Sequence, residues 1–251
     1  MVLISPADYS LACRRVFFCV ASIDPSPDSQ LMNDVYDGQT FEVMKRVLTR
    51  NSNCVDVGCH KGDILRGIIG TAPDGIHYAF EPIPSLFESL RTEFPSVHVL
   101  NIALSNVESV TSFQHVVSNP GYSGLKRRRY DREGEIVVPI TVKTATLDRI
   151  LPANFQLDFL KIDVEGAEVQ VFEGAIETIS RNKPFVVFEH GLGASDYYGT
   201  TPTAVYDLLT ERCGLSISLM EKWLDGGLAL TREEFVRQFD TGENYNFLGH
   251  P

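Results

Sequence analysis

The feature that most constrains this chain is a buried strand that leads through a glycine turn into a helix. Residues 55–63 read VDVGCHKGD, and apolar residues at helical spacing continue to Ile69. Glycine at positions Gly58 and Gly62 lets the backbone bend sharply and lets a ligand approach the main chain. Free N–H groups at the start of the helix are then expected to face that ligand. The pattern predicts a ligand site at the first crossover of an open α/β sheet.

The acids around this turn indicate which ligand it binds. Glu81 ends the apolar run of residues 76–81, where a carboxylate can accept both hydroxyl hydrogens of a ribose. A dinucleotide site would read G-x-G-x-x-G, whereas this turn reads D-x-G-x-x-x-G followed by Asp63. Asp56 and Asp63 would repel a pyrophosphate, but they suit a positively charged ligand such as S-adenosylmethionine. A structural turn in another kind of α/β protein is the alternative.

Length and composition set the class of protein. The chain has 251 residues, enough for a single domain over residues 1–251, with an N-terminal segment 1–50 that includes a lead-in helix at 40–48. The net charge of −11 argues against a nucleic-acid partner. Five scattered cysteines without a C-x-x-C pair predict reduced thiols and a cytoplasmic protein. The apolar run at 16–21 is too short to span a membrane, and residues 24–28 read as a loop.

Alternating strand and helix patterns predict the sheet. The first part of the chain runs β-α-β-α-β with short connections, which predicts parallel strands and right-handed crossovers. Further strands are predicted at 157–163, 185–188, 215–220 and 245–248. One helix is predicted to open at Gly166 and another at Thr201. Thr231 and Glu234 form a predicted capping box.

A β-rich insertion interrupts this rhythm at residues 107–143. Residues 107–117 and 136–143 read as an antiparallel pair, and the loop between them contains the basic run Lys126, Arg127, Arg128 and Arg129. Such a run is typical of a solvated loop. The alternative is that it attracts an anionic substrate.

Polar residues gather at the carboxyl ends of the predicted strands. Because these ends meet in one crevice of an open α/β sheet, we expect them to form one site. Asn101 and the main chain of Ala103, Leu104 and Ser105 are expected to bind the adenine edge. Asp163 is expected to face the reacting centre. The strand-end residues are Asp56 to Gly62, Glu81, Asn101, Asp163, and Glu189 with His190.

The sequence resembles the FkbM-type S-adenosylmethionine-dependent methyltransferases. The matching segments are VDVGCHKGD (55–63), FEP (80–82), NIALSN (101–106), LKIDVEGAEVQVFEGA (160–175) and FEHG (188–191). The resemblance implies a Rossmann-like, doubly wound α/β fold: a mostly parallel seven-stranded sheet, an antiparallel C-terminal strand and a small β insertion. It also implies methyl transfer to an oxygen, often on a sugar or another small metabolite. Pro82 falls in the implied cofactor site, as does His60, where the family usually carries Asn.

Methyl transfer to a hydroxyl requires a base with a pKa near neutral. His190 is the leading candidate, because histidine titrates in that range and His190 follows a strand end. Asp163 and Glu165 come next, as bases, substrate anchors or ligands of a divalent cation. Asp163, Glu189 and His190 could converge on such a cation, although a metal is not favoured. Lys161 is expected to be buried beside carboxylates.

Other functions stay open at this point. A nicotinamide-dependent oxidoreductase predicts the G-x-G-x-x-G pattern, which is absent. A module that binds the cofactor without chemistry is a further alternative, and the presence of Asp163 and His190 argues against it. For the enzyme we expect a small-molecule substrate, with no nucleic-acid or membrane partner. Self-association is compatible with the sequence.

Overall fold

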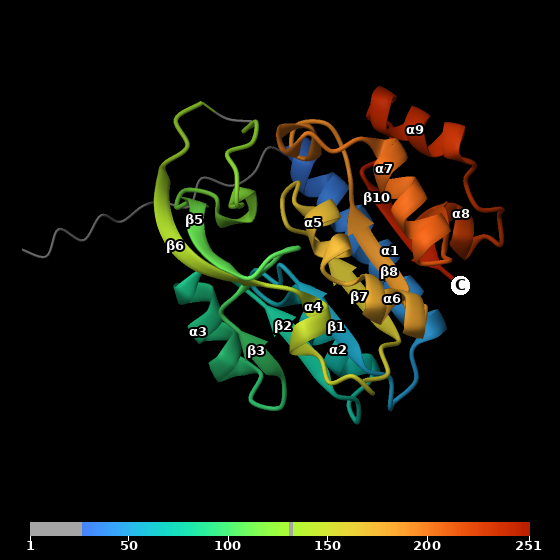
Figure 1. Ribbon diagram of the computed structural model, residues 1–251, viewed down its shortest axis with the longest axis horizontal. Helices are drawn as coiled ribbons and strands as arrows, with labels where there is room; N and C mark the ends of the chain where they lie inside the picture. Colours follow the sequence, from blue (N-terminus) through green and yellow to red (C-terminus); the bar gives the residue numbers. More distant parts are fainter. Residues whose placement is uncertain (1–26, 131–132) are drawn as a thin grey trace, which may run out of the picture.

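A seven-stranded sheet forms the centre of the computed structural model, which describes residues 27–130 and 133–251 (Figure 1). In spatial order the strands are β3 (His98–Leu100), β2 (His77–Phe80), β1 (Cys54–Val57), β7 (Phe159–Ile162), β8 (Phe185–Glu189), β10 (Asn246–His250) and β9 (Ser216–Leu219). The first five of these pair in parallel, whereas β10 is antiparallel to both of its neighbours. This confirms the predicted mostly parallel sheet with an antiparallel C-terminal strand.

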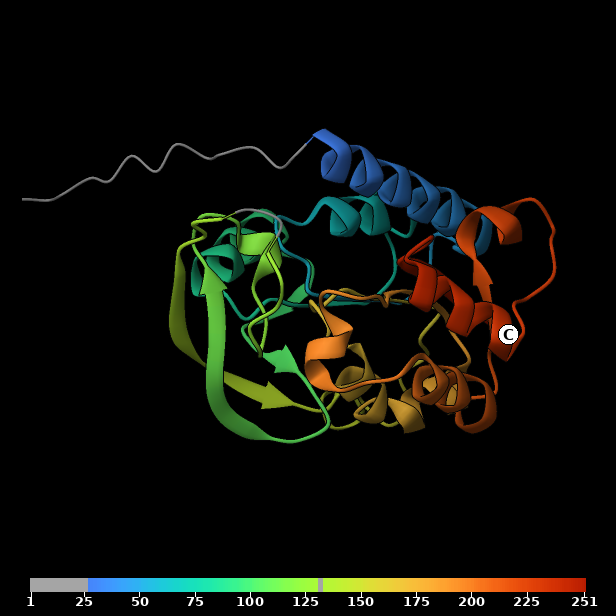
Figure 2. The same ribbon diagram turned by 90° about the horizontal axis from the view of Figure 1, so that it is seen from above.

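Helices cover both faces of this sheet (Figure 2). Because side chains alternate along a strand, Val55 and Leu160 face one helical layer while Cys54 and Phe159 face the other. The layer on Cys54 and Phe159 contains α1 (Pro27–Val47), α2 (Asp63–Thr71) and α8 (Met220–Leu224), and α3 (Pro84–Glu93) packs beside α2. The layer on Val55 and Leu160 contains α4 (Leu147–Ile150), α5 (Glu168–Glu173), α6 (Ile176–Asn182), α7 (Pro202–Asp207) and α9 (Arg232–Thr241).

Within the two described ranges, none of the helices combines the length and apolar character needed to cross a bilayer.

Some helix boundaries differ from the sequence prediction. α1 begins at Pro27, inside the stretch 24–28 that was predicted as a loop, because proline is tolerated in the first turn of a helix. Residues 24–26 and the apolar run 16–21 lie outside the described residues. The helix predicted from Gly166 is two helices, α5 and α6, which separate at Gly174. A Cβ at Gly174 would lie 2.1 Å from the carbonyl oxygen of Ser105, so close packing requires glycine there.

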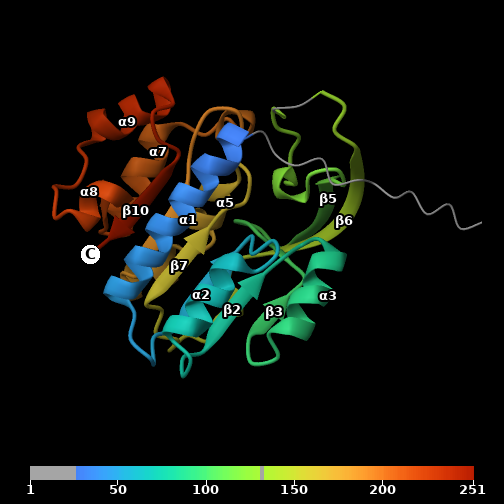
Figure 3. The ribbon, with the colours of Figure 1, turned by 180° about the vertical axis from the view of Figure 1, so that it is seen from behind.

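The predicted insertion forms a second, smaller sheet. β5 (Ser109–Val116) and β6 (Val137–Ala145) pair antiparallel as expected, and the short β4 (Ala103–Leu104) pairs in parallel with β6. Ala103, Phe113 and Val142 of this small sheet pack against Ile83, which precedes α3. Figure 3 shows β2 and β7 pointing toward the end of the main sheet where the insertion lies. The described residues also form two short 3₁₀ helices, η1 (Pro120–Tyr122) and η2 (Ser195–Tyr198), and the short π-helix η3 (Leu208–Arg212).

The turn after β1 is fixed by its contact with β7. The N–H of Asp163 donates to the carbonyl oxygen of Val57 over 3.0 Å. Gly58 follows with a φ of +76°, and a Cβ there would lie 1.8 Å from the carbonyl oxygen of Asp163. The close approach of two strand ends therefore requires Gly58. This packing requirement adds to the predicted role of Gly58 in admitting a ligand to the main chain, which stays a prediction.

Gly58→Ala should lower the free energy of unfolding by about 2–4 kcal/mol, because it adds a left-handed backbone penalty to an overpacked contact. Gly70→Ala is the matched control. Gly70 lies in α2 with open space around its Cβ position, so alanine should raise stability by about 0.5–1 kcal/mol. Urea unfolding of the two variants measures both effects. Equal stabilities would contradict the role assigned to Gly58.

Candidate active site

A cavity of about 580 Å³ lies at the carboxyl ends of β1, β2, β7 and β8, beneath the insertion. The order in which strands are added to the sheet reverses between β1 and β7, which is where an open α/β sheet offers a crevice. The predicted cofactor residues that line it are Gly58, His60, Asp63, Glu81, Pro82, Ala103, Leu104 and Asp163. The structure thus brings most of the predicted strand-end residues together.

The glycine turn is held by hydrogen bonds within the protein. The N–H groups of Gly58 and Cys59 donate to the carbonyl oxygen of Phe80, and the N–H of Gly62 donates to Cys59. The N–H of His60 donates to the Glu81 carboxylate over 2.9 Å. These four donors are therefore used within the protein. They precede α2, so the expectation that N–H groups at the start of that helix face a ligand stays a prediction. Asp63, the first residue of α2, lines the cavity.

Glu81 is the buried acid at the end of β2. Its side chain accepts one N–H on each oxygen, from His60 and from Ile83, both over 2.9 Å. Burial raises the pKa of the Glu81 carboxyl to about 7, although these two hydrogen bonds oppose the shift. Each carboxylate oxygen has a second acceptor position. Glu81 is therefore fixed in place and can still accept hydroxyl groups of a ligand in the cavity.

Some predicted cofactor residues have structural partners and do not line the cavity. The Asn101 amide donates to the carbonyl oxygens of Glu81 and Pro82, both over 2.9 Å, so it joins two strand ends. Ser105 lines a separate, smaller pocket beneath β6. Gly62 packs against Leu90 and Phe94. Asp56 is fully buried below the cavity floor. Because the Asn101 amide donates to two main-chain carbonyl oxygens and the residue does not line the cavity, the structure corrects the predicted contact of Asn101 with adenine.

Lys161 connects the floor of the cavity to the buried Asp56. Its ammonium donates to the carbonyl oxygen of Gly58 over 3.0 Å and lies 3.3 Å from Asp163 and 3.7 Å from Asp56. Burial alone would lower the pKa of Lys161, but Asp163 and Asp56 raise it above its usual range. Burial raises the pKa of the Asp56 carboxyl to about 6, against the effect of Lys161. The predicted burial of Lys161 beside carboxylates is thus observed.

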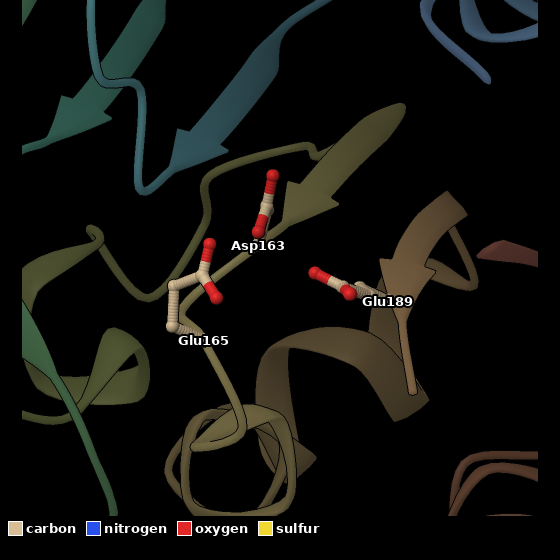
Figure 4. A group of neighbouring side chains, drawn as sticks. All are labelled: Asp163, Glu165 and Glu189. Atoms are coloured by element: carbon tan, nitrogen blue, oxygen red, sulfur yellow. The ribbon is translucent and has the colours of Figure 1, made fainter. Parts of the chain in front are cut away.

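Three carboxylates converge at the opposite side of the cavity. Asp163 follows β7, Glu165 lies in the next turn and Glu189 ends β8, and one oxygen of each lies within 4.8 Å of the others (Figure 4). Burial and the neighbouring Asp163 raise the pKa of the Glu189 carboxyl to about 8. A group with this pKa can exchange a proton in the neutral range. The same three oxygens have a spacing that could hold a metal ion.

The turn that carries Glu165 has a left-handed backbone. Glu165 has a φ of +59° and Gly166 has a φ of +105°. The buried carboxylate of Glu168 accepts the N–H of Gly166 over 2.9 Å and that of Val164 over 3.4 Å. Burial raises the pKa of Glu168 to about 7. Through these hydrogen bonds Glu168 stabilises the turn before α5.

Residues 56–216 match the model of the methyltransferase FkbM domain, which covers more than half of the chain. The chain belongs to the FkbM methyltransferase family. Within this FkbM domain, the match includes the glycine turn, Glu81, the Asp163 to Glu168 turn and Glu189. The sequence resemblance to this family is therefore confirmed.

Solved structures of other methyltransferases are similar to this FkbM domain. One is a methyltransferase FkbM from Methylobacillus flagellatus KT, at 17% identity over 81% of this chain, with a TM-score of 0.49. The chain spans 44% of the length of that structure. Another is a TehB-like SAM-dependent methyltransferase from Corynebacterium glutamicum, at 12% identity over 89% of this chain and 94% of its own, with a TM-score of 0.42. No curated protein matches the chain.

His190 lies outside the cavity of the FkbM domain. Its ring is fully buried, stacks on Phe235 and Phe239, and has no hydrogen-bond partner on either nitrogen within the described part of the chain. Burial lowers the pKa of His190 to about 4. A base must reach the substrate proton, so this placement corrects the assignment of His190. It also removes His190 from the predicted metal-binding set, in which Glu165 takes its place.

The basic loop divides between the cavity and its surroundings. Arg128 and Arg129 line the cavity, and Arg128 forms an ion pair with Glu165. The Lys126 ammonium lies over the Tyr198 ring, and the Arg127 guanidinium lies over the Tyr130 ring. The loop is therefore not uniformly solvated, and half of its charges face the site.

Lys161→Met should destabilise the protein by about 3–5 kcal/mol at pH 8, the cost of breaking a buried ion pair. The destabilisation caused by Lys161→Met should be smaller at pH 5 than at pH 8. The pKa of Asp56 is about 6 in the folded protein and 3.8 for the free side chain, so protonation of Asp56 favours the folded state at low pH. That contribution disappears as pH rises through the folded pKa. Denaturant unfolding at the two pH values measures the difference.

Lys45→Met is the control for this measurement, because the pair between Lys45 and Glu42 is exposed at both ends. It should change stability by less than about 1 kcal/mol at either pH. A Lys161→Met effect of the same size as the control would contradict the role of Lys161 in the cavity floor.

Proposed function

We propose that this FkbM-family chain is an S-adenosylmethionine-dependent methyltransferase that methylates a hydroxyl of a sugar or another small metabolite. The observation that carries the proposal is the convergence of Asp163, Glu165 and Glu189 in the cavity that also contains Glu81. One side of the cavity suits a nucleoside, and the other suits removal of a hydroxyl proton.

The cofactor end of the cavity fits S-adenosylmethionine. Glu81 is held by two backbone donors and can accept the ribose hydroxyls. Ile83 and Ile102 line the same cavity and offer apolar surface to the adenine base. Asp63 and Asp163 complement the positive charge of the ligand. When bound, the cofactor supplies a methyl group on a sulfonium, which becomes a neutral thioether as the methyl leaves.

The acceptor end of the cavity supplies the base. We assign this role to Glu189 together with Asp163, because the two carboxylates lie side by side in the cavity and because burial and then Asp163 raise the pKa of Glu189. The acceptor oxygen loses its proton to this pair and forms the new bond to carbon. Glu165 is close enough to orient the acceptor hydroxyl. Positioning of the acceptor in line with the methyl group supplies a further part of the rate enhancement.

The partner that fits this site is a small molecule. The net charge of −11 disfavours nucleic acid as a substrate. Arg128 and Arg129 in the cavity wall support an acceptor that also bears a carboxylate or phosphate. A panel that pairs neutral sugars with their uronic acids and phosphates, read out by release of S-adenosylhomocysteine, distinguishes the two acceptor types.

Glu81→Gln should weaken S-adenosylmethionine binding by about 1.5–3 kcal/mol, the range for hydrogen bonds to a charged group. The affinity of the unmodified protein should also fall as pH drops below about 7, because protonated Glu81 loses an acceptor. Isothermal titration calorimetry measures both effects. Glu93→Gln, in the exposed pair with Arg66, is the control. Unchanged affinity in Glu81→Gln would remove Glu81 from the cofactor site.

Glu189→Gln should lower kcat by about 10²–10⁴, the usual range for general base catalysis, with cofactor affinity nearly unchanged. The rate of the unmodified enzyme should rise with pH through about 8, because Glu189 accepts a proton only when ionised. His190→Phe preserves the buried stack on Phe239 and should retain activity. The measurement is initial rate with the best acceptor of the panel.

The opposite pattern, an active Glu189→Gln and an inactive but folded His190→Phe, would return the base to His190. The same assay with a chelator tests for a metal-dependent mechanism. If EDTA stops the reaction and Mg²⁺ restores it, the three carboxylates act as metal ligands and the metal supplies the acidity.

A further inference from the structure

One segment of the insertion closes the acceptor side of the cavity. We call residues 119–129 the strap. Asn119, Tyr122, Leu125 and Arg128 are among its cavity-lining residues. The strap is not part of the main sheet, so other contacts must hold it over the site.

Backbone hydrogen bonds attach the strap to the loop after β8. The N–H of Lys126 donates to the Tyr198 hydroxyl over 2.8 Å, and the N–H of Arg129 donates to the carbonyl oxygen of Gly193 over 3.1 Å. The Lys126 ammonium also lies 5.0 Å from the centre of the Tyr198 ring. Gly124 is also bridged to β5, where it and Gln114 exchange backbone hydrogen bonds of 2.8 and 3.2 Å. A further contact joins the strap to the turn of residues 163–168, which we call the catalytic turn.

That contact is the ion pair between Arg128 and Glu165. The two side chains are 14% and 15% exposed, and the Arg128 guanidinium lies 5.0 Å from the centre of the Tyr122 ring. The Nε of Arg128 is buried and has no hydrogen-bond partner within residues 27–130 and 133–251. A guanidinium that is this buried depends on the one carboxylate that it pairs with.

The backbone of Glu165 explains why its side chain needs such a partner. A non-glycine residue with a φ of +59° is held by its surroundings, and Glu168 holds only the main chain of this turn. Asp163 and Glu189 each place a carboxylate oxygen within 4.8 Å of the Glu165 carboxylate, and Arg128 is the cation that pairs with it. Repulsion from these carboxylates would turn it away from the site.

We propose that Arg128 is a positioning residue that docks the strap onto the catalytic turn and holds the Glu165 carboxylate in the cavity. The strap and the three carboxylates Asp163, Glu165 and Glu189 then depend on each other for their position. The catalytic meaning of this coupling rests on the proposed function, whereas the docking itself does not.

Hydrogen exchange tests the docking without any need for methyl transfer. In Arg128→Met, the amides of Lys126, Arg129 and Gly166 should exchange about tenfold faster or more, because loss of a buried ion pair frees the strap and the turn. Glu165→Gln should produce the same increase, and the double variant should add little to either single change. Arg127→Met is the matched control, since Arg127 lies over Tyr130 and does not line the cavity. Exchange in Arg128→Met that equals the control would overturn the proposal.

Two further measurements keep the outcomes distinct. If Arg128→Met does not fold, the charge exchange Arg128→Glu with Glu165→Arg should restore protection of the three amides, and failure to restore it would count against the pair. Calorimetry with S-adenosylhomocysteine is independent of these results. No binding to the unmodified protein would remove the proposed function while the exchange result stands.

Discussion

The ammonium group of Lys161 is the interaction on which the geometry of the cavity depends. It joins the two central strands at the end where the site is built, through Asp56 of β1, the carbonyl oxygen of Gly58 and Asp163 after β7. Without a cation, a buried Asp56 would either lose its charge or destabilise the fold. With it, the glycine turn is held down onto β7 and Asp163 is directed into the cavity. The floor of the site is thus set by charges that lie below it.

Three acidic side chains above this floor have different roles. Burial raises the pKa values of Glu81, Glu168 and Glu189 to about 7, 7 and 8, so each changes protonation near neutral pH. Glu168 uses its oxygens to hold the main chain of the catalytic turn, and Glu81 uses its own to hold the turn after β1. Glu189 instead faces another carboxyl, Asp163, and that difference in partners distinguishes a structural acid from the proposed base.

The sequence was sufficient to predict the sheet, the antiparallel insertion and the edge at which the site forms, because apolar periodicity and strand ends are local signals. The choice between Glu189 and His190 required one more step. Side chains alternate along a strand, and Val186 and Phe188 face the layer of α5 to α9. His190 lies on the same side as Val186 and Phe188. The side chain of Glu189 lies on the other side and lines the cavity. The alternation was present in the sequence and could have excluded His190. The role of Asn101 could not be predicted, since a strand-end amide can serve a ligand or a neighbouring carbonyl equally well.

The pairing of Arg128 with Glu165 was beyond sequence reasoning for a physical reason. The two residues lie in loops of different sheets, and no periodicity relates them. The same fact explains why the strand-end residues of the site are easier to infer than the strap. Strand ends of the main sheet supply Glu81 at the proposed cofactor end and Asp163 and Glu189 at the proposed acceptor end, and there the fold dictates which residues meet. A strap attached by a few contacts closes the acceptor end, so small changes in residues 119–129 can alter the acceptor without altering the sheet. Acceptor choice in this chain is therefore expected to follow the insertion rather than the fold.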